Sequence, residues 1–304
     1  MPALITHRLF GEESMERLPQ GLIASGEERA AFLLANQGPD PFFFRFRTRS
    51  MRSCMELAQV MHRSRMSRQF AVLREGTSRL NEEDARIGRA FSLGLLSHYV
   101  LDRNAHPFVY EQQWGIMEAD PDLADMGSSV HAVIESDLDV LMLQLKRAQG
   151  TTLDYPPTDE LATDDHINKV AGALMSHVAM KVYDLDVAAF EYGGAVADMK
   201  LAYRAIEPAG SIATRVHPML AGLAHPITSE LPRRAGNLDH KAWRNPFTDA
   251  ASTESFPEVF DRALDDYRAT AARFIDGVDM AEVTRHLNYS GRPLDASEEC
   301  DQED

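Results

Sequence analysis

The sequence has little cysteine and no long apolar run. Its two cysteines, Cys54 and Cys300, lie far apart among 304 residues and exclude a disulfide framework. The most apolar stretch, residues 91–101, is much shorter than the roughly 20 apolar residues of a membrane-spanning helix. The first residues also lack the apolar run of roughly 7–15 residues that a signal peptide needs. These absences predict a cytoplasmic protein without stable membrane insertion.

Basic residues are also in deficit. The chain has 47 Asp and Glu against 31 Lys and Arg, a formal net charge of −16. Residues 295–304 hold six of the acids, so the rest of the chain still carries −16 + 6 = −10. An acidic surface repels phosphate backbones, and a nucleic-acid partner is therefore not expected. A small phosphate site remains compatible with this charge if the site brings its own cations.

Apolar residues recur mostly at helical intervals, and the alternation typical of strands is almost absent. Ser25 and Glu28 form a capping-box pattern, and Asn81 is suited to cap a later helix. Because Pro107 disfavours helix at the preceding residue, His106 is predicted at or just past a helix end. Helices are expected from Ser25 to before Gly38 and over about 50–65, 70–73, 84–104, 128–148, 165–181, 186–205 and 258–276.

The predicted fold class is therefore all-α. The long helices on either side of Pro156 each need a partner for their apolar faces, which favours one domain over two. We expect a single multi-helix bundle over residues 1–290. Residues 291–304 have the composition of an acidic, disordered tail.

The residues best suited to chemistry are His98, Asp102 and His106, followed by His131 and Glu135. Helix residues four apart share a face, with Cβ atoms roughly 5–6 Å apart, so each pair could reach one metal ion. A triple of His, acid and His at this spacing is expected only roughly 0.06 times in a chain of this composition. A buried histidine beside a solvated Asp is the alternative interpretation, and spacing alone leaves both open.

With these residues in place, the chain resembles the zinc-dependent phospholipase C family, which is distantly related to the fungal single-strand nucleases. Five motifs carry the resemblance, and they occur in the order found in the family. They are Ile5-Thr6-His7, Gly38-Pro39-Asp40, Met61-His62, Phe91-x-x-Gly94-x-x-x-His98-Tyr99-x-x-Asp102-x-x-x-His106-Pro107 and His131-x-x-x-Glu135.

The resemblance implies a helical bundle of the phospholipase C and single-strand nuclease type, with a zinc cluster in a cleft. One zinc ion would be held by Asp40, His62, His98 and Asp102, and a second by His106, His131 and Glu135. Asp102 would bridge from the first zinc to another, and His7 would contribute to a third, which secreted members complete with the amino group of an N-terminal Trp. Here Met1 precedes His7 by six residues, which leaves the third zinc open.

The implied activity is hydrolysis of a phosphoric ester by metal-activated water, as in a phospholipase C-like phosphodiesterase. Zinc lowers the pKa of bound water to about 7 and stabilises charge on phosphoryl oxygens. Asp40 is the candidate catalytic residue, as a general base or a residue that orients water. The substrate would be a small phosphoester or a phospholipid. Two alternatives remain: a catalytically silent metal-binding scaffold, and a single-strand nuclease, which the acidity disfavours.

Other polar residues match no family motif, and the oligomeric state is undetermined. Asp137 and Asp139 are expected at solvated helix positions, with a lesser possibility that they support the metal histidines. The remaining histidines are expected at the surface, in caps or in the core. They are His166, His177, His217, His225, His240 and His286.

Overall fold

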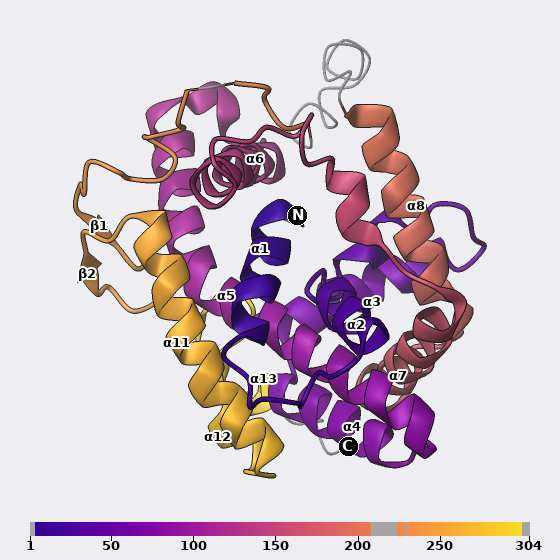
Figure 1. Ribbon diagram of the computed structural model, residues 1–304. Coiled ribbons are helices and arrows are strands. Elements are labelled where there is room, and N and C mark those ends of the chain that lie inside the picture. Colours follow the sequence, from indigo (N-terminus) through magenta and orange to yellow (C-terminus); the bar gives the residue numbers. More distant parts are fainter. Residues whose placement is uncertain (1–3, 208–223, 229, 300–304) are drawn as a thin grey trace.

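The computed structural model describes residues 4–207, 224–228 and 230–299, and these residues are mostly helical (Figure 1). The helices are α1 (Leu4–Met15), α2 (Gly26–Ala35), α3 (Met51–Arg63), α4 (Met66–Ser78), α5 (Glu82–Ala119), α6 (Gly127–Lys146), α7 (Asp165–Tyr183), α8 (Phe190–Ile206), α11 (Phe256–Ile275), α12 (Met280–Thr284) and α13 (Ala296–Glu299). The 3₁₀ turns are η1 (Asp40–Phe44), η2 (Pro121–Leu123) and η3 (Pro157–Leu161). Strands β1 (Trp243–Arg244) and β2 (Ala251–Ser252) pair antiparallel, with Trp243 opposite Ser252. The predicted all-α class is confirmed.

Helix α5 is the axis of the fold and packs against α2, α11, α6, α4, α1 and α7. It begins at the predicted cap, where the Asn81 side chain accepts the Asp84 N–H. Every residue from 91 to 100 is buried, as in a helix that is apolar on all sides. Gly94 permits the close approach of α2, since a Cβ there would lie 2.1 Å from the Phe32 carbonyl oxygen. The polar residues of α5 are thereby carried into the interior.

The predicted end of this helix near His106 was wrong, because α5 continues through Pro107 to Ala119. A proline inside a helix removes a backbone donor and typically costs about 3 kcal/mol. Tertiary packing offsets this cost here: Phe108 is buried, and Gly291 sits so close that a Cβ on it would lie 2.3 Å from the Arg103 carbonyl oxygen. His106 therefore stays on the same helical face as Asp102.

Helix α1 was not among the predicted helices. It packs against α6, α5, α2 and α11, and Figure 1 shows it in the middle of the view with the other helices around it. Its buried residues include His7 as well as the apolar Leu4, Leu9 and Phe10. This helix therefore brings a candidate metal ligand into the interior from the N-terminal part of the chain.

Residues 291–299 have structure and contacts, although their composition predicted disorder. Glu299 is buried in α13 and accepts a hydrogen bond from the Ser67 hydroxyl at 3.0 Å. Arg292 pairs with Glu298 within the same segment. Residues 300–304 of the expected tail lie outside the described part of the chain, and the domain boundary at residue 290 stays a prediction. Among the described helices, none combines the length and apolar character needed to cross a membrane.

Candidate metal centre

The eight predicted metal-site residues come from five elements and meet in one place. His7 lies on α1, Asp40 on η1 and His62 on α3, while α5 and α6 carry the others, which are His98, Asp102, His106, His131 and Glu135. All but His98 line one cavity of about 330 Å³, and His98 is fully buried. Residues far apart in the sequence thus form one polar cluster inside a largely apolar bundle.

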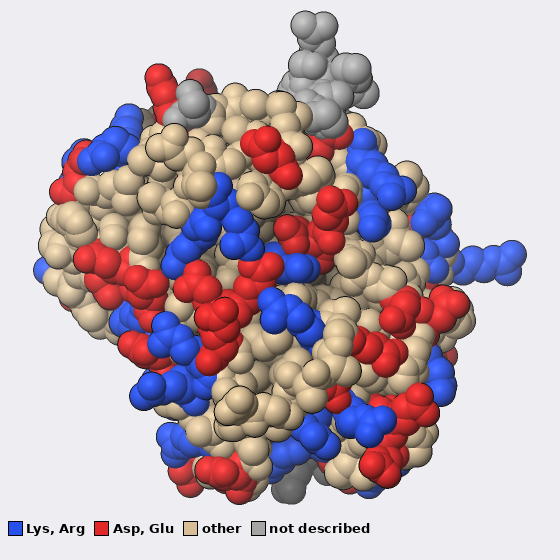
Figure 2. Space-filling model, viewed as in Figure 1, with Lys and Arg blue, Asp and Glu red and all other residues tan. Residues whose placement is uncertain are grey.

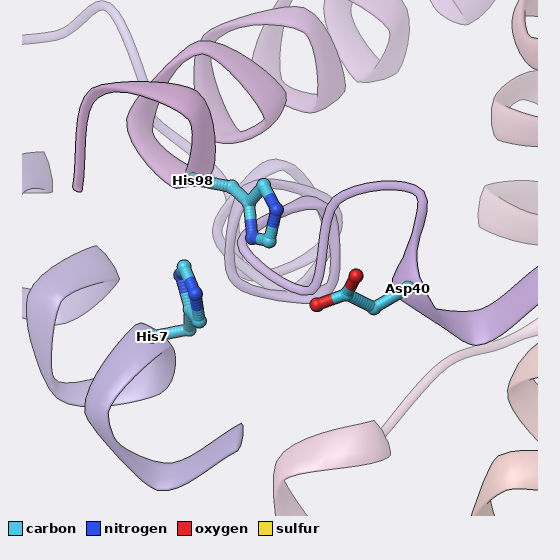
Figure 3. A group of neighbouring side chains, drawn as sticks. All are labelled: His7, Asp40 and His98. Atoms are coloured by element: carbon cyan, nitrogen blue, oxygen red, sulfur yellow. The ribbon is translucent and has the colours of Figure 1, made fainter. Parts of the chain in front are cut away.

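Asp102 lies at the centre of the first part of the cluster. Its Oδ1 is 3.1 Å from His7 Nε2, and its Oδ2 is 3.3 Å from His98 Nε2. Asp40 Oδ1 lies 3.1 Å from His62 Nε2. Figure 3 shows His7, Asp40 and His98 approaching one another from three separate elements. One carboxylate therefore faces two imidazoles, which is the arrangement a bridging ligand would need.

The second part of the cluster is formed where α5 meets α6. Glu135 Oε1 lies 3.2 Å from His131 Nε2 and 3.6 Å from His106 Nε2. His106 Nδ1 is also 3.8 Å from Asp102 Oδ1, so His106 connects the two parts. The rings of His106 and His131 stack, with centroids 5.4 Å apart.

These residues are suited to zinc in both chemistry and spacing. Three groups can each bring one nitrogen or oxygen per residue to within 4.8 Å of the others. The buried Nε2 of His98 makes no hydrogen bond to any described residue, although burying such an atom unpaired is costly. Zinc takes imidazole and carboxylate ligands in such numbers. The groups are His7, Asp40 and His98; His62, His98 and Asp102; and His106, His131 and Glu135.

Four of the five imidazoles are oriented by an oxygen on the far side of the ring. Each accepts a hydrogen bond from Nδ1, which leaves Nε2 unprotonated and directed at the cluster in the neutral ring. This arrangement fixes both ring direction and tautomer for metal binding. The pairs are His62 with the Ala58 carbonyl at 2.6 Å, His98 with the Asn36 carbonyl at 3.0 Å, His106 with the Tyr289 carbonyl at 2.9 Å, and His131 with Gln113 Oε1 at 2.8 Å.

The turn before η1 shapes two ligands at once. Gly38 has φ +56°, which non-glycine residues rarely adopt, and a Cβ there would lie 2.3 Å from His98 Cδ2. The Asn36 carbonyl in the same turn accepts the hydrogen bond from His98. The turn ends at Asp40. It therefore orients the candidate ligand His98 through the Asn36 carbonyl and positions the candidate ligand Asp40.

Charges inside the cluster compensate one another when no metal is bound. Burial alone would raise the pKa of Asp102, but the charges of His106, His98 and His7 hold it well below its usual value. Burial alone would lower the pKa of His106, whereas Asp102 and Glu135 raise it to about 10. A metal ion would replace these protons as the balancing positive charge.

Sequence reasoning missed several residues around the cluster. Tyr289 lines the cavity with its ring 4.7 Å from that of His62, and its hydroxyl accepts a hydrogen bond from Gln69 at 2.9 Å. Phe43 and Tyr110 also line the cavity. No local pattern connects Tyr289 to ligands so far away in the chain. The aromatic run at 42–44 next to Asp40 allows either a pocket lining or core packing, and the structure places Phe42 and Phe44 in the core and Phe43 at the cavity.

The expectation that Asp139 is solvated was wrong. It is fully buried, while Asp137, two residues earlier, is half-buried. His225 is buried beside Asp139 and contacts none of the eight predicted ligands within the described residues. Of the other unassigned histidines, His240 is exposed, and His217 lies outside the described residues.

Comparison with known proteins gives one match. The model of a family described as zinc dependent phospholipase C matches residues 6–181, more than half of the chain and a span that includes all eight clustered residues. No curated protein and no solved structure matches the chain.

Proposed function

Because the chain belongs to the zinc-dependent phospholipase C family, we propose that it is a zinc-dependent phosphoric ester hydrolase of the phosphodiesterase type. The observation that supports this most directly is the convergence of three candidate ligand groups on one cavity. Bound zinc supplies Lewis-acid stabilisation of a phosphoryl oxygen and lowers the pKa of coordinated water to about 7.

The proposed ligand assignment is the one implied by the family resemblance, and the close approach of these side chains is compatible with it. Asp40, His62, His98 and Asp102 form one set, and Asp102 also faces His7, which would serve a third site. The other set, on α5 and α6, is His106, His131 and Glu135. Asp102 would contribute to both the first and the third site, because its two oxygens face His98 and His7 separately.

Asp40 has the features required of a general base or water-orienting residue. It is 4% exposed and lines the cavity, and its Oδ1 lies 3.1 Å from His62 Nε2. Burial alone would raise the pKa of Asp40, but His62 and His98 hold it below its usual value, so the carboxylate is ionised and can accept a proton.

The cavity walls support a small ester with an apolar portion as substrate. Arg63 and Gln59 contribute hydrogen-bond donors to the cavity lining, whereas Phe43 and Tyr110 contribute aromatic rings. The centroid of the Tyr110 ring lies 5.6 Å from that of Trp114, and Trp114 is 44% exposed at the surface. A volume of about 330 Å³ suits a phosphoryl group with one small substituent, and a longer chain would extend along Trp114.

A nuclease function has less support. The face of the molecule shown in Figure 2 carries acidic and basic side chains interspersed over its described residues. Proteins that bind single-stranded nucleic acid instead combine a continuous basic groove with stacked aromatic residues. A small phosphodiester, phosphomonoester or short-chain phospholipid therefore fits this protein better.

The test is hydrolysis of nitrophenyl phosphocholine and of a nitrophenyl phosphonate ester by zinc-loaded protein. We expect chelation to abolish turnover and added zinc to restore it, and Asp40→Asn to lower the rate about 10²–10⁴-fold. Zinc content must be measured in parallel, because metal loss would mimic loss of the base. If zinc-replete wild type shows no turnover above that of Asp40→Asn on diesters, monoesters or short-chain phospholipids, the protein is a metal-binding scaffold.

A further inference from the structure

The first turn of α1 is held by a side chain from a distant helix. Asp139 of α6 accepts the backbone N–H of Ile5 at 2.9 Å through Oδ2 and that of Thr6 at 2.7 Å through Oδ1. The first N–H groups of a helix have no partner within it, and a carboxylate at this end is electrostatically favoured. Asp139 therefore caps α1 from across the core, immediately before His7.

Asp139 is itself held by a buried chain of charged groups. His225 Nε2 lies 2.9 Å from Asp139 Oδ2, and His225 Nδ1 lies 2.9 Å from Glu207 Oε1. Glu207 also accepts the backbone N–H of His225 at 2.7 Å. All three side chains are at most 9% exposed. Because both ring nitrogens donate to carboxylates, His225 is an imidazolium that balances part of their charge.

His7 differs from the other imidazoles of the cluster in its support. The other four donate Nδ1 to a protein oxygen, but His7 Nδ1 makes no hydrogen bond to any residue the structure describes. Its ring stacks on that of His98, with centroids 4.1 Å apart, and so packs against another member of the cluster. The direction of His7 is therefore set by the placement of α1, which depends on Asp139.

We infer that Asp139 is a positioning residue for the metal centre, holding α1 so that His7 reaches the metal ion shared with Asp102. The inference rests on the proposed function only in taking the cluster as a metal centre, since it concerns metal binding and not hydrolysis. Asp139 takes the place of the outer hydrogen-bond partner that His7 lacks. Loss of such a partner typically weakens metal binding 10–100-fold.

The experiment measures zinc affinity and zinc content of Asp139→Asn, His7→Gln and the double variant. Asn keeps the shape but has one acceptor oxygen, so it cannot receive both amides. We expect each single substitution to lower the zinc affinity of the site that His7 serves about 10–100-fold. We expect the double variant to bind zinc there no more weakly than His7→Gln alone. Asp137→Asn is the matched control on the same helix, and we expect it to bind zinc like wild type.

A merely structural role would give a different pattern. Destabilisation of the whole bundle would weaken all zinc sites, so the effects of Asp139→Asn and His7→Gln would add in the double variant. Additive effects, or wild-type zinc binding in either single variant, would overturn the inference. If Asp139→Asn does not fold, Glu207→Gln replaces it in the experiment. Glu207→Gln should then weaken zinc binding when it is introduced into the wild-type protein, but should cause no further loss when it is added to His7→Gln. Zinc binding by Glu207→Gln equal to that of wild type would refute the proposal. Absence of hydrolysis would count against the proposed function alone.

Discussion

Replacing Gly38 with alanine tests how tightly the turn before Asp40 controls the metal centre. An added Cβ would lie 2.3 Å from His98 Cδ2 and 2.4 Å from Nε2, and the backbone would have to keep φ +56°. The His98 ring has little room to move away, because it is fully buried, hydrogen-bonded to the Asn36 carbonyl and stacked on His7. The substitution therefore combines backbone strain with steric overlap at a ligand.

The size of the effect follows from these two contributions. A positive φ costs a non-glycine residue about 1 kcal/mol, and overpacking a rigid core costs about 1–3 kcal/mol, for a total of about 2–4 kcal/mol. Gly21→Ala is the matched control, since Gly21 has φ +80° and nothing lies within 4 Å of its added Cβ. In a chain of this length, 1 kcal/mol shifts Tm by about 1.5–2 °C.

The assay is thermal unfolding followed by circular dichroism in the presence of chelator, together with zinc content after dialysis. We expect Gly38→Ala to lower Tm by about 3–8 °C and to lose zinc, because the added methyl group would overlap the His98 ring. Gly21→Ala should lower Tm by about 2 °C and keep its zinc. Equal Tm shifts and equal zinc contents in the two variants would refute the argument.

Three further predictions concern the centre and its supports. Asp102→Asn should reduce zinc content far more than Asp137→Asn in metal analysis, because Asp102 faces two imidazoles; equal retention would contradict its central place. Gly94→Ala should destabilise the fold by at least about 2 kcal/mol in urea unfolding, since its Cβ would overlap the Phe32 carbonyl, and a neutral result would mean that α2 can shift. Burial would lower the pKa of His225, but Asp139 and Glu207 raise it to about 9, so its contribution is complete below about pH 6.5 and is lost as pH rises to about 9. The stability advantage of chelated wild type over His225→Gln should thus shrink by about 3 kcal/mol over that range, whereas a pH-independent difference would show that His225 is not charged.

Some of this protein could be predicted from the sequence because it depends only on neighbours along one helix. The caps at Ser25 and Asn81 were confirmed, since a cap needs only residues within one turn. Helical periodicity likewise put His98, Asp102 and His106 on one face, and His131 beside Glu135. The sequence also determined the all-α class, because amphipathic spacing recurs along most of the chain.

Only the tertiary structure decided how these pieces meet. Local rules ended α5 near His106, yet packing beside Gly291 carries the helix through Pro107. Local rules also gave Asp139 a solvated position, whereas it is buried because the amides of α1 and the His225 ring supply its partners. Such partners lie far away in the chain, and which of them arrive depends on how whole helices pack. Spacing along a helix therefore determined which ligands share a face, and helix packing determined that these faces close around one cavity.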